Sequence, residues 1–186
     1  DTPTRRIKGK FDELSKIRKY RESVPDWLDA LGEQELGEAL WTEELHSLNS
    51  LAPVVLRVNS LKISRDRLQQ LLREEGVEGY PLQQYPDALQ LVERSNIFKS
   101  QSFKDGLFEV QDASSQKVAP FMQIDNSVKR IIDTCAGAGG KTLHLATLLQ
   151  NKGQIIAMDI YEQKLQELKR RARSNGAFNI ETKLID

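Results

Sequence analysis

Few features of this sequence fit a secreted or membrane-bound protein. Its 186 residues contain one cysteine, Cys135, so no disulfide can form within the chain, and we expect a cytoplasmic location. The longest apolar runs end within about six residues, whereas a membrane-spanning helix needs ~20. The charged N-terminus predicts no secretory signal. The only two histidines, His46 and His144, have no cysteine or carboxylate at ligand spacing, so no metal site is predicted.

Neither sign of charge is in excess, but the charges are unevenly distributed. Over the whole chain 27 Lys and Arg balance 27 Asp and Glu. Residues 1–21 carry eight Lys or Arg and three acids, and residues 22–48 carry eight acids and no Lys or Arg. These two segments either neutralise each other or have different functions. A basic segment points toward a polyanion such as nucleic acid, because each cation that neutralises a phosphate releases counterions, and solvated helix faces are the alternative.

Residues 1–49 are predicted to form a helical extension. Apolar residues recur at helical spacing over 8–22 and again over 26–48. Gly32 and Gly37 interrupt the second of these segments, so we expect shorter helices joined by turns there.

Three residues of this extension have a specific predicted place. Pro25 fits the first position of a helix, where a missing amide costs nothing. Trp27 and Trp41 lie in amphipathic segments and are interpreted as anchors of a small core.

Residues 50–127 are predicted to form a small α+β domain with one sheet. Short β-branched or apolar runs predict strands at 54–58, 88–92 and 107–110, and capped or periodic segments predict helices at 64–76 and 112–122.

Residues 128–186 change to a regular strand-helix alternation. The predicted order is strand 129–134, glycine-rich loop 135–140, helix 141–149, strand 154–159, helix 161–175 and strand 180–185. This order is typical of an α/β fold with a parallel, doubly wound sheet. Such a sheet usually has more than three strands, so we expect the chain to be a piece of a longer protein.

The glycine-rich loop is the strongest candidate for a ligand site. Gly137, Gly139 and Gly140 lie between a strand and a helix, where backbone amides can approach a ligand and the helix N-terminus favours anions. Asp159 ends the next strand, where a carboxylate can accept hydrogen bonds from the ribose of an adenosine-containing ligand. Capping of the following helix is the alternative function of Asp159.

Two nucleotide-binding motifs match this loop only in part. The P-loop motif G-x-x-x-x-G-K-[ST] fits Gly140–Thr142, but Cys135 stands at its first glycine. The dinucleotide motif G-x-G-x-x-G fits Gly137 and Gly139, but Thr142 stands at its third glycine. An adenosine ligand without a pyrophosphate is favoured, and S-adenosylmethionine fits that description. A P-loop-like ATP-binding protein remains the alternative, and it predicts preferential binding of Mg-ATP.

Three segments together resemble a known family. Residues 133–142, Asp-Thr-Cys-Ala-Gly-Ala-Gly-Gly-Lys-Thr, look like the cofactor motif of the Sun (Fmu), RsmB-type, family of RNA 5-methylcytosine methyltransferases. Residues 56–59 resemble a strand of that family's RNA-binding domain, and residues 110–116 resemble the linker that follows it. The resemblance covers about residues 50–186 and implies action on RNA, ribosomal in preference to transfer RNA.

The resemblance implies an overall organisation and a set of site residues. The fold class is a Rossmann-like S-adenosylmethionine-dependent methyltransferase domain, incomplete here, preceded by a small α+β RNA-binding domain and an N-terminal helical extension. The implied cofactor site consists of Cys135, Ala136, Gly137, Ala138, Gly139, Gly140, Lys141, Asp159 for the ribose and Asp186 near the adenine. With the basic segment considered, the RNA-contacting candidates are Arg5, Arg6, Lys8, Lys10 and Arg57.

The catalytic cysteines of that family have no counterpart here. The nucleophile that attacks C6 of cytosine, and a second cysteine that helps release the product, both lie beyond the third strand of the family's catalytic domain. Cys135 matches a loop cysteine beside the cofactor, so we expect it to form part of the cofactor wall instead of acting as the nucleophile. The 186 residues are therefore not expected to turn over, and a non-catalytic RNA-binding module is a further alternative.

Overall fold

The computed structural model describes residues 3–125 and 127–185. The chain separates into two compact units, Asp1–Ala52 and Pro53–Asp186. Within the described ranges, no helix combines the length and the apolarity that crossing a bilayer requires.

The first unit is entirely helical. Its elements are α1 (Pro3–Leu14), α2 (Arg18–Arg21), α3 (Asp26–Leu36) and α4 (Glu38–Asn49). Helices α3 and α4 pack against each other at Gly32, where an added Cβ would lie 2.2 Å from the ring of Trp41. Gly32 therefore lies inside α3 and permits close packing, so the predicted interruption there is wrong. Gly37, with φ +78°, separates the two helices as predicted.

The two tryptophans of this unit differ in burial. Trp41 is 7% exposed and donates from Nε1 to Asp29 Oδ1 at 3.0 Å, which confirms its prediction as a core anchor. Trp27 is 68% exposed, so its prediction as a core anchor is wrong. Pro25 is the N-cap of α3 and lies one residue before the predicted position. Helical periodicity alone did not show which face of α3 meets α4.

The basic and acidic segments of the first unit neutralise each other in part. Arg18 pairs with Asp29 and Glu33 of α3, and Lys19 pairs with Asp26. The remaining basic cluster lies on α1, a helix without buried residues. Mutual neutralisation is therefore confirmed in part, and a separate function of the basic residues on α1 stays a prediction.

The second unit begins with an antiparallel sheet. Its elements are β1 (Val55–Val58), α5 (Arg65–Glu74), β2 (Gly79–Pro81), β3 (Ala88–Leu91), a 3₁₀ turn (Ile97–Lys99), α6 (Gln101–Lys104) and β4 (Phe108–Val110). The strand order β2-β3-β1-β4 and the βαββαβ sequence define a ferredoxin-like domain. The sequence pattern missed β2 because Gly79 and Pro81 disfavour a strand, although proline is tolerated at the edge position that β2 occupies.

Strand β1 is buried on both faces. Leu56 and Val58 point into a core with Leu68 and Leu72 of α5. Because side chains alternate along a strand, Arg57 points to the opposite face, and it is only 2% exposed. That second face of the sheet is therefore covered by other residues of the protein at Arg57.

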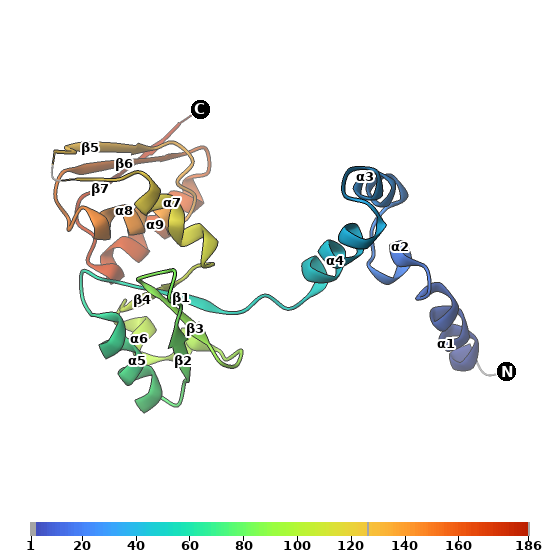
Figure 1. The fold of residues 1–186 in the computed structure, drawn as a ribbon. Helices are drawn as coiled ribbons and strands as arrows, with labels where there is room; N and C mark the ends of the chain where they lie inside the picture. Colours follow the sequence, from blue (N-terminus) through green and yellow to red (C-terminus); the bar gives the residue numbers. More distant parts are fainter. Residues whose placement is uncertain (1–2, 126, 186) are drawn as a thin grey trace. The chain divides into compact units, whose positions relative to one another are not determined.

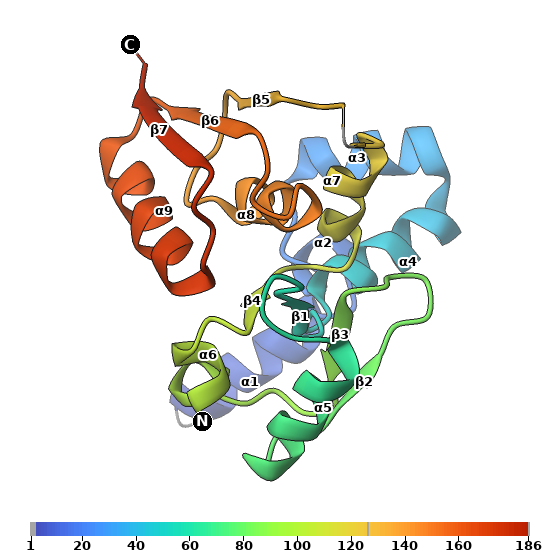
Figure 2. The same cartoon turned by 90° about the vertical axis from the view of Figure 1, so that its left-hand side faces the viewer.

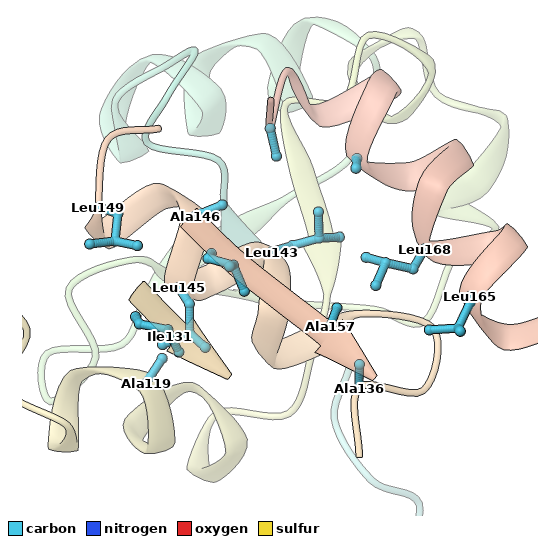
Figure 3. Close-up of a cluster of buried hydrophobic side chains, with 13 residues drawn as sticks. Ala119, Ile131, Ala136, Leu143, Leu145, Ala146, Leu149, Ala157, Leu165 and Leu168 are labelled. Atoms are coloured by element: carbon cyan, nitrogen blue, oxygen red, sulfur yellow. The ribbon is translucent and has the colours of Figure 1, made fainter. Parts of the chain in front are cut away.

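A parallel sheet follows in the same unit. Its elements are a 3₁₀ turn (Ser114–Lys117), α7 (Val118–Phe121), β5 (Arg130–Asp133), α8 (Gly140–Leu148), β6 (Gln154–Asp159), α9 (Glu162–Asn175) and β7 (Ile180–Leu184). The order β5-β6-β7 places α8 and α9 on the same face of the sheet (Figures 1 and 2). Side chains from β5, β6, α8 and α9 form one apolar cluster between the sheet and these two helices (Figure 3). The predicted strand-helix alternation is confirmed.

Helices α8 and α9 form a layer between the two sheets. Both ribbon views show the ferredoxin-like sheet on the side of these helices that faces away from the parallel sheet (Figures 1 and 2). Accordingly, residues 142–147 of α8 are all buried. A helix that is buried all round packs on both sides, so α8 is part of the interface between the two domains of this unit.

Candidate functional site

The glycine-rich loop connects the carboxyl end of β5 to α8. Gly137 and Gly139 have φ values of +53° and +89°, and Gly139 is the N-cap of α8. An added Cβ on Gly139 would lie 2.1 Å from Cδ1 of Leu168, so only glycine fits the space and the backbone angle. At Gly137 no atom lies within 4 Å of such a Cβ, so space is open beside the loop.

Asp159 lies at the carboxyl end of the neighbouring strand and contacts the loop directly. Its Oδ2 accepts from the N–H of Gly137 at 2.8 Å, and its Oδ1 accepts from the N–H of Tyr161 at 2.9 Å. These hydrogen bonds, first that of Tyr161 and then that of Gly137, lower the pKa of the carboxyl. Helix α9 has Tyr161 as its N-cap and no side-chain cap hydrogen bond, so the alternative that Asp159 caps this helix is wrong. Asp159 instead accepts from the N–H of the N-cap residue itself. The ribose contact stays a prediction.

Asp133 is a second acid at this edge of the sheet, and it was not predicted as a site residue. Its Oδ2 accepts from Oγ1 of Thr142 at 2.7 Å, and its Oδ1 accepts from the N–H of Cys135 at 3.3 Å. Thr142 is fully buried, and a P-loop would need this hydroxyl on a metal ion. The arrangement therefore disfavours the P-loop alternative. The position of Asp133 as the last residue of a strand, like that of Asp159, was the available signal.

The remaining loop candidates lie in different surroundings. Cys135 is exposed and lines a hollow of about 230 Å³ together with Lys141, which is also exposed. Ala136 is 8% exposed and its N–H donates to Met158 O at 2.9 Å. Asp186, the predicted adenine-side acid, lies outside the described residues.

Arg57 does not lie where an RNA contact needs it. Its side chain is 2% exposed, and its Nη1 donates to the carbonyl of Gly140 at 2.6 Å and to Oε1 of Gln111. Burial lowers its pKa to about 10. The prediction that Arg57 contacts RNA is therefore wrong, because the central strand of the sheet points it into the domain interface.

A second guanidinium holds the loop from helix α9. Arg171 Nη1 donates to the carbonyl of Ala138 at 2.5 Å, and its Nη2 donates to Glu109 Oε2 at 2.6 Å. Glu109, 6% exposed on β4, also accepts from Nδ2 of Asn175 at 2.7 Å. None of these three residues was predicted to belong to the site, although a glutamate inside a predicted strand was a signal.

The other basic candidates lie together on α1. Arg5, Arg6, Lys8 and Lys10 are all exposed on this helix. Lys10 pairs with Glu13 at 3.0 Å. Their contact with RNA remains a prediction.

The two histidines lie on helices, His46 on α4 and His144 on α8. Among residues 3–125 and 127–185, no group of three or more His, Cys, Asp or Glu could hold a metal ion. His144 is 2% exposed in the domain interface, and its Nε2 lies 3.8 Å from Oδ2 of Asp87.

Comparison with known protein families gives two matches in the order of the two domains. Residues 24–98 match the family described as Methyltr_RsmF/B-like, ferredoxin-like domain. Residues 122–186 match the family described as 16S rRNA methyltransferase RsmB/F. The chain belongs to the RsmB/F family of methyltransferases. The resemblance to the Sun (Fmu), RsmB-type, family and the predicted fold class are thereby confirmed, with the α+β domain now identified as ferredoxin-like.

Relatives of the RsmB/F family align over most of this chain. Ribosomal RNA small subunit methyltransferase B of Klebsiella pneumoniae is 38% identical over 144 residues, which are 77% of this chain and 33% of that protein. The protein of the same name from Escherichia coli is 36% identical with the same coverage. This chain therefore spans about a third of the length of the curated relatives it matches.

Solved structures share the fold. A methyltransferase homolog protein from Pyrococcus horikoshii matches with a TM-score of 0.80 and 26% identity, covering 89% of this chain and 54% of that one. NSun6 from the same organism matches with a TM-score of 0.76 and 18% identity, covering 87% and 65%. The arrangement of elements in most of this chain is therefore found in both of these solved structures.

Proposed function

We propose that this protein is an S-adenosylmethionine-dependent RNA cytosine-C5 methyltransferase that acts on ribosomal RNA. The observation that carries the proposal is the glycine-rich loop braced on Asp159, in a chain of the RsmB/F family. The relatives named as ribosomal RNA small subunit methyltransferases support the substrate class. We also propose the domain bounds 1–49, 50–127 and 128–186.

The residues present fit an adenosine ligand that carries a carboxylate. Space is open beside Gly137. The first N–H groups of α8, which begins at Gly140, have no acceptor within the helix. An anion is favoured at that helix end. Each oxygen of Asp159 uses one lone pair for a backbone N–H, which leaves capacity to accept from ribose hydroxyls.

S-adenosylmethionine, when bound, supplies the methyl group. In our proposal the amides of Gly140 and Lys141 bind its carboxylate, and Asp159, kept ionised by its depressed pKa, orients the ribose. Cys135, exposed at the loop, forms part of the wall. That the family's two catalytic cysteines lie outside these 186 residues remains a prediction from the resemblance.

RNA contact is proposed for helix α1. Its exposed basic residues, among them Arg6 and Lys8, are placed on a helix without buried residues. Each cation that neutralises a phosphate should contribute about one unit to the slope of log affinity against log salt. The double substitution of Arg6 and Lys8 by glutamine should therefore lower that slope for ribosomal RNA fragments by about two.

Titration of the 186-residue chain with S-adenosylhomocysteine and with Mg-ATP tests the cofactor proposal. We expect saturable binding of S-adenosylhomocysteine, no binding of Mg-ATP, and at least tenfold weaker binding after Asp159→Asn, because the amide loses the charge and one acceptor. Glu162→Gln is the matched control, because Glu162 is an exposed acid in the first turn of α9, three residues after Asp159. This variant should bind S-adenosylhomocysteine like the unmodified chain. Preferential binding of Mg-ATP would overturn the proposal.

A further inference from the structure

The glycine-rich loop is held from outside by a cross-strand pair of the ferredoxin-like sheet. The register of β1 and β4 places Arg57 opposite Glu109. Arg57 donates directly to the carbonyl of Gly140 at 2.6 Å. Glu109 acts through Arg171, which it binds at 2.6 Å and which donates to the carbonyl of Ala138 at 2.5 Å. Both loop carbonyls therefore depend on neighbouring positions of one sheet.

These two carbonyls lie on either side of Gly139, where only glycine fits the backbone angle and the space. Gly139 has φ +89°, and the held carbonyls belong to the residues before and after it. A trans peptide is planar, so its N–H points opposite to its C=O. Fixing the carbonyl of Gly140 toward the ferredoxin-like sheet therefore directs the N–H of Lys141 away from that sheet. Fixing the carbonyl of Ala138 does the same for the N–H of Gly139.

The environment of Arg57 suits a directional contact. Arg57 is 2% exposed, and its two hydrogen bonds go to one loop carbonyl, that of Gly140, and to the side-chain amide oxygen of Gln111, with no carboxylate as acceptor. A buried charge of this kind is weak evidence for stability, since an apolar side chain of similar volume often does as well. A glycine-rich loop has high conformational entropy, and external hydrogen bonds that order it reduce the cost of binding.

We propose that Arg57 and Glu109 are positioning residues of the cofactor loop, so that the ferredoxin-like domain is a structural part of the methyl-donor site. The inference rests on the proposed function for the identity of the ligand. The geometry of the loop is a property of the ligand-free chain, so this part of the inference does not depend on the proposed function.

Arg57→Met is the decisive variant, because methionine keeps an apolar stem and removes every donor. We expect S-adenosylhomocysteine to bind at least tenfold more weakly by calorimetry, with a small change in thermal midpoint. Arg57→Lys keeps one charged donor and should recover part of the affinity. Lys62→Gln is the matched control, since Lys62 joins the same two domains through the carbonyls of Asp105 and Ser174 without touching the loop. Its affinity should stay within twofold of the unmodified chain.

Hydrogen exchange of the ligand-free chain gives a second readout. Followed by NMR at Gly139 and Lys141, exchange should be faster in Arg57→Met, intermediate in Arg57→Lys and unchanged in Lys62→Gln. Unchanged exchange and affinity in both Arg57 variants would overturn the positioning function, and if the methionine variant does not fold, the lysine variant decides. If the unmodified chain does not bind S-adenosylhomocysteine but exchange responds to Arg57, the proposed cofactor fails and the positioning function stands.

Discussion

Each of the two units has an arginine that joins separate elements, and the two arginines work differently. In the first unit, Arg18 donates to Asp29 at 2.8 Å and to Glu33 at 2.5 Å, and these hydrogen bonds raise its pKa. In the second unit, Arg57 donates to a side-chain amide and to the carbonyl of Gly140, and burial lowers its pKa. The first arginine neutralises charge, and the second one orients a peptide.

The contacts of Arg18 concern the stability of the first unit, whereas the contact of Arg57 concerns the orientation of the loop. The ion pairs of Arg18 lie near the surface, so salt should weaken them and other surface pairs could replace them. The contact of Arg57 is buried, uncharged on the acceptor side and specific in direction. If the two arginines differ in this way, substitutions in the first unit should leave the cofactor loop unaffected. Substitutions at the domain interface of the second unit should alter the loop.

The largest effect is expected from Gly139→Ala in the second unit. The new Cβ would lie 2.1 Å from Leu168 at a positive φ, so the loop or α9 must shift. We expect a loss of about 3 kcal/mol in the free energy of unfolding of this unit, by urea titration followed by far-UV circular dichroism. Binding of S-adenosylhomocysteine should be lost as well.

Gly137→Ala is the matched control for that substitution. It also has a positive φ, +53°, but its Cβ would meet no atom within 4 Å, so the cost should be about 1 kcal/mol. Equal losses for the two variants would show that backbone conformation, and not packing on Leu168, sets the cost.

A smaller effect, confined to the first unit, is expected from Gly32→Ala. Its Cβ would lie 2.2 Å from the ring of Trp41, so α3 and α4 must separate, at a cost of about 2 kcal/mol. Tryptophan fluorescence reports this unit alone, because Trp27 and Trp41 are the two tryptophans of the sequence.

Gly9→Ala, in an open position of α1, should instead stabilise its helix by about 0.5 kcal/mol. A change in ligand affinity after Gly32→Ala would break the proposed separation of the units.

The smallest effect concerns His144 in the domain interface. Burial lowers its pKa, with the charge of Arg57 acting in the same direction and Asp87 opposing both. A histidine with a lowered folded-state pKa contributes stability that is complete above the unfolded value of about 6.5 and is lost as the pH falls through the folded value. The urea midpoint should therefore decrease from pH 7.5 to pH 5.5.

Two substitutions test this pH dependence. His144→Gln removes the titrating group and should flatten the profile, whereas His46→Gln, at an exposed position, should leave it unchanged. A profile that is flattened equally by both variants would contradict the assignment to the buried histidine.

Much of the fold was predictable from local patterns. The strand at Val55–Val58 and the parallel βαβ unit followed from β-branched runs, glycines and helix caps. Strand β2 was not predictable, because Gly79 and Pro81 disfavour a strand and only pairing with β3 produces one. Trp27 and Trp41 had the same local pattern, and only the packing of α3 on α4 distinguishes the exposed ring from the buried one.

The candidate site divides in the same way. The sequence by itself determined the glycine-rich loop and Asp159, because a left-handed backbone and a strand-end carboxylate depend on residue type and spacing along the chain. Only the tertiary structure decided that Arg57 faces the loop and not solvent, and that Glu109 and Arg171 complete the contact. The physical reason is that strand alternation gives a side chain one of two faces, and what covers that face depends on residues more than 80 positions away, as from Arg57 to Gly140.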